Sequence, residues 1–109
     1  MDKKLVAKKT KQGLRFFEES GNACENVTHI IQERVCRMML RKIRDYFNEQ
    51  KIDMNTLQAK TGLSYSTVYK LLNFTEGDKI RIGTIYAIVI GFEKNLSDFM
   101  PTPEEVLEG

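Results

Sequence analysis

This chain lacks long apolar runs, and it lacks the residue clusters on which most enzyme and metal sites depend. No apolar stretch approaches the roughly 20 residues that a membrane-spanning helix needs, so we expect no membrane partner. The basic N-terminus has neither the apolar centre nor the cleavage site of a secretory signal, which favours a cytoplasmic protein. With only two prolines and seven glycines, the composition argues against a low-complexity chain.

Cysteine and histidine are scarce. Eleven residues separate Cys24 from Cys36, and His29 is the only histidine, whereas zinc sites usually show close pairs of ligands. We therefore expect buried or idle thiols in a reducing compartment and no metal. No nucleophile–base pair, glycine-rich phosphate loop or paired carboxylate cluster has plausible spacing, so we expect neither an enzyme nor a cofactor.

Positive charge is unevenly distributed, although the net charge is only +2. Residues 1–15 carry six lysines and arginines against Asp2 alone, residues 34–44 are again basic, and the tail from Glu93 is acidic. Such polarity suits a protein with one face toward a polyanion. A charge run is also the ordinary pattern of a solvated face.

Helical periodicity dominates the middle of the chain. From Val27 to about Gln50 apolar residues recur at threes and fours, which predicts one long helix, with a kink near 34–38 left open. Residues 1–26 fit no single helical stripe, and we see no strand-like alternation, so we expect a weak helix or arm followed by a loop. Prolines 101 and 103 end the last helical turn, and we expect a loose tail after it.

The most informative stretch runs from Ile52 to Phe74. Asp53 is a good N-cap for a helix of about 54–60, and Gly62 can end that helix in a left-handed conformation. Ser64 is placed to cap a second short helix from Tyr65 to about Leu72. Two short helices joined by a tight turn hold the second helix out as a probe that fits the DNA major groove.

At this point the pattern resembles a known family. Residues 38–100 resemble the Cro/phage-repressor (XRE) type of helix-turn-helix domain, over about sixty percent of the chain. The matching core positions are Leu57, Gly62, Leu63, Ser64, Val68 and Leu71. Residues 85–100 resemble the fourth and fifth helices of the family, with Gly91 and Phe92 where a small residue and a leucine usually stand.

The resemblance implies an all-α fold with a five-helix lambda-repressor-like helix-turn-helix domain, and we expect an N-terminal helical extension outside that domain. We expect residues 1–34 to form that extension, residues 35–100 the DNA-binding domain, and residues 101–109 an acidic tail.

The family's docking mode also implies site residues. The start of the second helix of the motif would read bases, through Tyr65, Ser66, Thr67, Tyr69 and Lys70. Phosphate contacts would come from the start of the preceding helix and from the segment after the reading helix. These residues are Met54, Asn55, Asn73, Thr75, Lys79, Arg81 and Thr84. Without that context, Ser, Thr and Tyr are common on solvated helix faces, and Lys79 and Arg81 can serve solubility alone.

We expect a sequence-specific double-stranded DNA-binding regulator, of the prophage or plasmid repressor type. One alternative is an antitoxin that binds a toxin protein and autoregulates its operon. The other is a protein-interaction module that has lost DNA binding, which Gln58 at the helix crossing and the small net charge would favour. We expect a homodimer, which pairs either through the N-terminal segment, the preferred interpretation, or through Tyr86 and Ile90.

Overall fold

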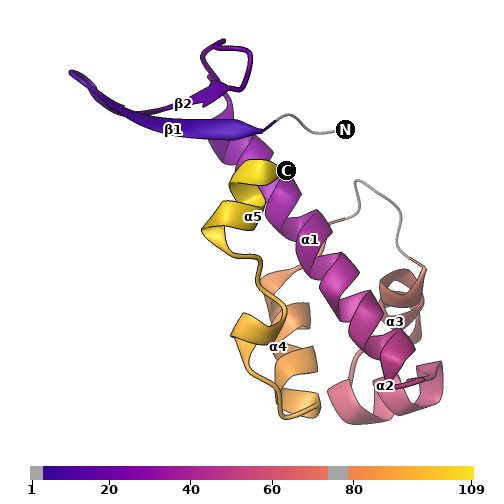
Figure 1. Ribbon diagram of the computed structural model, residues 1–109. Coiled ribbons are helices and arrows are strands. Elements are labelled where there is room, and N and C mark those ends of the chain that lie inside the picture. Colours follow the sequence, from indigo (N-terminus) through magenta and orange to yellow (C-terminus); the bar gives the residue numbers. More distant parts are fainter. Residues whose placement is uncertain (1–3, 74–78) are drawn as a thin grey trace. The chain divides into compact units, whose positions relative to one another are not determined.

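A computed structural model describes residues 4–73 and 79–109, in the order β1–β2–α1–α2–α3–α4–η1–α5 (Figure 1). The chain divides into two compact units. One comprises Cys36–Met100, and the other comprises Met1–Val35 together with Pro101–Gly109.

The long helix expected in the middle of the chain is confirmed. Helix α1 spans Val27–Glu49 as one uninterrupted α-helix, without the break considered near 34–38. Its later turns bury Leu40, Ile43 and Phe47 in the core of the larger unit. The spacing of these residues at three and four positions is what places them on one face.

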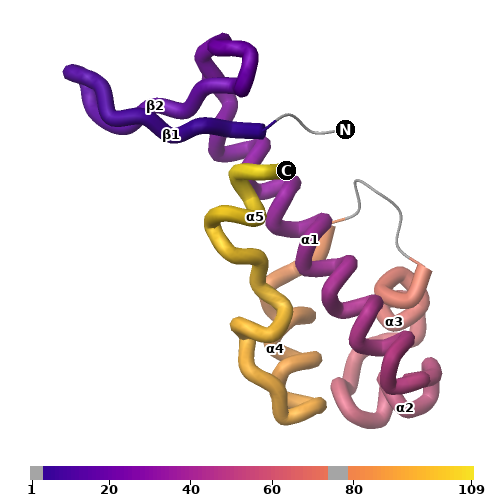
Figure 2. Tube along the Cα trace, in the orientation of Figure 1, coloured from indigo at the N-terminus to yellow at the C-terminus, as the bar shows by residue number. Residues whose placement is uncertain are grey.

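The two short helices and the turn expected after Asp53 are present, although the first helix ends one residue later than expected. Helix α2 spans Met54–Thr61, and its N-cap Asp53 accepts a hydrogen bond from the Thr56 N–H at 2.8 Å. Gly62 has φ 72°, a left-handed value that glycine adopts without strain. Helix α3 spans Tyr65–Leu72, and Ser64 accepts from the Thr67 N–H. Figure 2 shows the backbone turning sharply between the two helices.

Helix α4 spans Ile82–Gly91 and is followed by a short 3₁₀ helix, η1, over Leu96–Asp98. A side chain at Gly91 would clash with the backbone carbonyl of Lys60, at the end of α2. The absence of a side chain at Gly91 is therefore what lets α4 approach α2 this closely.

These helices enclose one hydrophobic core within the larger unit. Its members come from α1, α2, α3, α4 and the residue after η1, so each α-helix of the unit contributes at least one buried side chain. The fully buried members include Ile43, Phe47, Leu57, Val68 and Ile88. Burial of such side chains is worth roughly 1.5–3 kcal/mol each, and it fixes the direction in which α3 points its other face.

The expectation of an all-α fold is wrong, because residues 5–18 form an antiparallel β-hairpin. Strand β1 (Leu5–Thr10) pairs with β2 (Gly13–Glu18), with Leu5 opposite Glu18 and Thr10 opposite Gly13. Lys11 and Gln12 form the turn. The Thr10 hydroxyl donates to the Gly13 carbonyl and accepts from the Gln12 N–H, and Gly13 has φ 113°.

The missing alternation has a physical reason. A strand alternates in polarity only where one of its faces is buried. Here Leu5 is buried, but Ala7 to Thr10 and Gly13 to Arg15 are exposed, so the outer half of the hairpin needs no apolar face. The N-terminal extension is accordingly a hairpin followed by the start of α1, not a weak helix.

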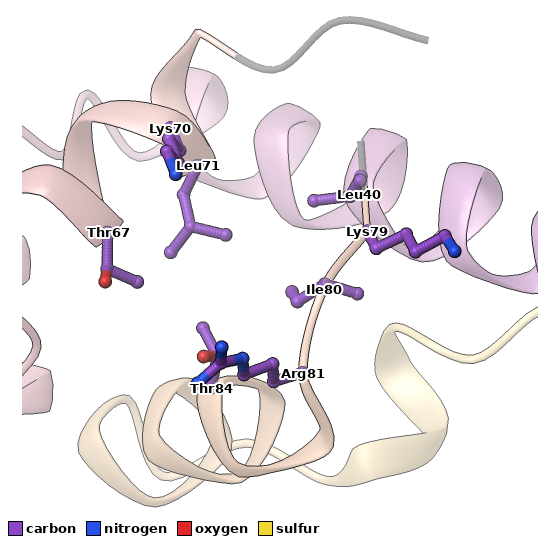
Figure 3. A pocket seen from close by; sticks show the side chains of 8 residues that line it. All are labelled: Leu40, Thr67, Lys70, Leu71, Lys79, Ile80, Arg81 and Thr84. Atoms are coloured by element: carbon purple, nitrogen blue, oxygen red, sulfur yellow. The ribbon is translucent and has the colours of Figure 1, made fainter. Parts of the chain in front are cut away.

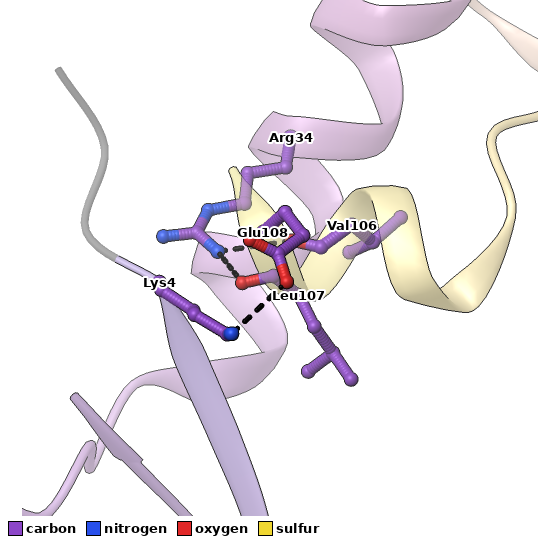
Figure 4. Close-up of polar contacts among 5 residues, drawn as sticks. All are labelled: Lys4, Arg34, Val106, Leu107 and Glu108. Carbon is purple, nitrogen blue, oxygen red and sulfur yellow. Dashed lines mark hydrogen bonds and ion pairs between the residues drawn. The ribbon is translucent and has the colours of Figure 1, made fainter. Parts of the chain in front are cut away.

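The acidic tail is helical rather than loose. Helix α5 spans Pro103–Glu108, with Pro103 in its first turn and a capping box between Thr102 and Glu105. The helix packs against β1, and Val106 is buried. Figure 4 shows how α5 is held. The buried guanidinium of Arg34 donates to the carbonyls of Val106 and Leu107, and Lys4 pairs with Glu108 at 3.1 Å.

Candidate nucleic-acid interface

The outward face of α3 carries four of the five residues expected to read bases, all exposed. Tyr65 is 61% exposed and Tyr69 53% exposed, while Val68 and Leu71 on the opposite face are buried. The two tyrosine rings stack on each other, with centroids 6.5 Å apart and planes 21° apart. Ser66 and Lys70 complete the exposed set. A one-turn spacing places the tyrosines one above the other on the helix.

Hydroxyl groups gather at the start of α3. The Ser64 oxygen lies 2.9 Å from the Thr67 hydroxyl and 3.3 Å from that of Ser66. Thr67 is only partly exposed, because its side chain turns back toward the cap. The cap therefore fixes where the Thr67 hydroxyl points before any ligand arrives.

A hollow of about 590 Å³ opens beside α3, between this helix and the start of α4. Figure 3 shows Thr67 and Lys70 on the α3 side, Arg81 and Thr84 on the α4 side, and Leu71 and Ile80 pointing into the space. The full lining comprises Leu40, Thr67, Lys70, Leu71, Lys79, Ile80, Arg81 and Thr84. Five of the expected DNA-contacting residues, from two separate segments, thus border one hollow.

The start of α4 adds to the positive potential of this hollow. Arg81 is the N-cap of α4 but makes no side-chain cap hydrogen bond there, and its carbonyl accepts from the Thr84 N–H at 3.0 Å. The first N–H groups of a helix carry partial positive charge and have no partner within the helix. Lys70, Lys79 and Arg81 are exposed cations near this end. The arrangement suits an anion.

Asn73 is exposed but already engaged. Its side-chain amide donates to the Tyr69 carbonyl at 3.1 Å and caps the end of α3. The amide nitrogen keeps a second hydrogen that it could donate to an anion, because a side-chain NH₂ carries two donors. Thr75, also expected to contact phosphate, lies outside the described residues.

Met54 and Asn55 stand at the start of α2, as expected, but their surroundings differ from those at α4. The Met54 side chain packs against the core, so only its backbone N–H faces the helix end. The Asp53 carboxylate occupies that end through its bond to Thr56. A phosphate at α2 would meet this negative charge, whereas the α4 end presents arginine and lysine.

Sequence reasoning missed two features of the interface. The apolar floor of the hollow, with Leu40 from α1 and Ile80 from the segment before α4, could not be found from spacing, because the two residues are forty positions apart. The Tyr65–Tyr69 stack could have been predicted, because aromatic residues at positions i and i+4 of one helix lie close enough to contact each other.

The described residues contain neither a metal-binding cluster nor a membrane-spanning helix. No group of three histidine, cysteine, aspartate or glutamate side chains in this part of the chain could hold a metal ion. None of the described helices combines the length and apolarity needed to span a membrane. Comparisons with family models, with curated proteins and with solved structures find no significant match to the chain.

Proposed function

We propose that this protein is a cytoplasmic, non-enzymatic regulator that binds double-stranded DNA sequence-specifically, as a repressor of the Cro/XRE helix-turn-helix type. Helix α3 would enter the major groove and present Ser66, Tyr69 and Lys70 to base edges. Hydroxyls can pair with either base type, and a lysine can donate to guanine O6 and N7.

The hollow between α3 and α4 is the observation that carries this proposal. It brings Lys70, Lys79 and Arg81 and the exposed end of α4 to one side of the reading helix. Phosphate contacts of this kind fix the register of a helix in the groove, while the helix itself reads the bases. A helix-turn-helix used only for protein contacts would have no need for cations gathered beside its second helix.

A second copy of the chain is the partner we propose. Ile82, Tyr86 and Ile90 stand at successive i, i+4 positions on α4 and are 63%, 47% and 73% exposed. An apolar row left in water is typical of an association surface. A two-fold dimer would also place two reading helices about one helical turn, roughly 34 Å, apart.

The proposal is tested by measuring affinity for duplex DNA at several salt concentrations. Each phosphate neutralised adds roughly 0.9 to the slope of log affinity against log salt. We expect a steep slope for the wild type and a shallower one for the Lys70→Ala/Arg81→Ala variant. Lys51 and Lys60 are exposed but do not line the hollow, so Lys51→Gln/Lys60→Gln is a charge-matched control. No binding at low salt, or a flat dependence, would reject the proposal.

A further inference from the structure

The outer half of the β-hairpin carries a cluster of positive charge that lies outside the helices proposed to bind DNA. No acidic residue occurs in the sequence between positions 3 and 17; the flanking acidic residues are Asp2 on one side and, on the other, Glu18 and Glu19 at the base of the hairpin. The exposed cations of the hairpin beyond that base are Lys8, Lys9, Lys11 and Arg15.

The strand register places like charges opposite each other. Lys8 pairs with Arg15 across the two strands, and directly opposed like charges destabilise a hairpin. The Lys8 ammonium also lies 5.8 Å from the centre of the Phe17 ring, on the same face. A hairpin selected only for stability would not oppose two cations. A polyanionic ligand would remove the repulsion.

The hairpin is anchored at one end and open at the other. Leu5 is buried, β1 contacts α5, and Lys4 pairs with Glu108, so the base is fixed within its unit. Toward the turn, residues 7–15 are exposed from both strands. A two-stranded ribbon of this kind is one of the two elements that the major groove admits.

We propose that this hairpin is a second DNA-binding element, which contacts phosphate groups of a duplex through Lys8, Lys9, Lys11 and Arg15. The inference rests on the proposed function, in which the unit Cys36–Met100 supplies the first contact. Lysines on exposed strand edges also prevent unwanted strand pairing. That role predicts aggregation on their removal, with no change in DNA affinity.

The test uses the full-length protein with Lys9→Gln and Lys11→Gln together. Both positions are exposed, and Lys11 lies in the turn, so the hairpin should still form. The probe is a random-sequence duplex of about three helical turns, roughly 30 base pairs. We expect the salt slope to become shallower by about 1.8, the value for two phosphate contacts. The control Lys51→Gln/Lys60→Gln removes the same charge from the other unit and should leave the slope unchanged.

The outcomes separate this inference from the proposed function. A hairpin variant with the wild-type slope overturns the hairpin contact, whether or not the variant aggregates, and leaves the proposed function standing if Lys70→Ala/Arg81→Ala weakens binding. The reverse pattern, with loss only in the hairpin variant, supports the hairpin and rejects the proposed function. Wild-type binding to phosphatidylserine vesicles but not to the duplex would overturn both.

Discussion

The guanidinium of Arg34 donates a hydrogen bond of 2.9 Å to the carbonyl oxygen of Val106, seventy-two positions further along the chain. A second bond, of 3.2 Å, reaches the carbonyl of Leu107. Carbonyls at the end of a helix have no partner within it, so one cation from α1 satisfies the end of α5. The tail helix therefore depends on a residue far from it in sequence.

Removing this cation should release α5. Arg34 is only 4% exposed, and a hydrogen bond to a charged group contributes about 1.5–3 kcal/mol, so Arg34→Met should lower the free energy of unfolding by about 2 kcal/mol or more. Amide hydrogen exchange at Val106 and Leu107 should accelerate. Lys4→Gln is the control, because the exposed Lys4–Glu108 pair should contribute less than about 1 kcal/mol. An equal loss of unfolding free energy in Arg34→Met and Lys4→Gln would contradict the conclusion that Arg34 holds α5 in place.

Glycine in α4 offers a matched pair of substitutions. A Cβ at Gly91 would meet the Lys60 carbonyl, which is backbone and cannot swing aside, so Gly91→Ala should destabilise the fold by about 1–3 kcal/mol. Gly83 lies in the same helix with open space around it, and Gly83→Ala should stabilise by about 0.5–1 kcal/mol. Thermal melts of both variants measure this. A neutral Gly91→Ala would mean that α2 and α4 pack less closely than described.

The parts of the fold that could be predicted are those fixed by neighbours in sequence. Asp53 caps a residue three positions away, Ser64 does the same, and Gly62 needs only its own backbone freedom. Such signals act over one helical turn, and so they survive without knowledge of the tertiary structure. The boundaries of α2 and α3 follow from them.

The sequence predictions for the hairpin and for the tail were wrong for different reasons. Lys8 opposite Arg15 gives no apolar alternation, so the strands have no signature in hydropathy, and only the Thr10–Gly13 turn marked them. For α5 the local signal was present, because Thr102 and Glu105 have capping-box spacing and proline is favoured in a first helical turn. The prolines were interpreted only as a stop.

The candidate site was predictable as a list of residues but not as a shape. Lys70 and Arg81 were expected to contact DNA from family docking alone. That they border one hollow with Leu40 depends on contacts between three distant segments, which no spacing rule supplies. The engagement of Asn73 with the Tyr69 carbonyl is likewise a property of the folded helix end.

Acid should weaken the N-terminus of α2. The backbone N–H of Thr56, with support from its side chain, holds the pKa of Asp53 below its ordinary value. This stabilisation is fully present above the unfolded-state pKa and is lost as pH falls through the lower, folded pKa. The difference between the urea midpoints of wild type and Asp53→Asn should therefore shrink as pH falls from neutral through the lowered folded-state pKa of Asp53. Asparagine caps nearly as well but does not titrate there, so parallel curves would contradict the assignment.

Substitution of Lys70 and substitution of Lys79 should change DNA binding in different ways. Lys70 lies on the exposed face of α3, so Lys70→Ala should relax the base preference at one position, by about 1–3 kcal/mol of discrimination. Lys79 lies outside the reading helix, and Lys79→Ala should weaken all sequences alike while the salt slope falls by about 0.9. Selection of bound DNA from a random pool, followed by titrations, distinguishes them. An unchanged preference in Lys70→Ala would place another face of α3 in the groove.

Assembly should depend on the apolar row of α4. If a second copy covers Ile82, Tyr86 and Ile90, then Ile82→Glu/Ile90→Glu places carboxylates in the interface. Central interface residues typically contribute about 2 kcal/mol or more, so the dimer dissociation constant should rise by roughly thirtyfold or more.

Sedimentation of the full-length protein measures this assembly. Both isoleucines are exposed in the single chain, so the variant should keep the wild-type helix content. Leu14→Glu, at an equally exposed leucine of the hairpin, is the control and should remain dimeric. A monomeric wild type would reject dimerisation. If Leu14→Glu is monomeric while Ile82→Glu/Ile90→Glu remains dimeric, the interface lies on the unit that carries the hairpin. In that case only the substitution in the hairpin would have broken the contact between the two copies.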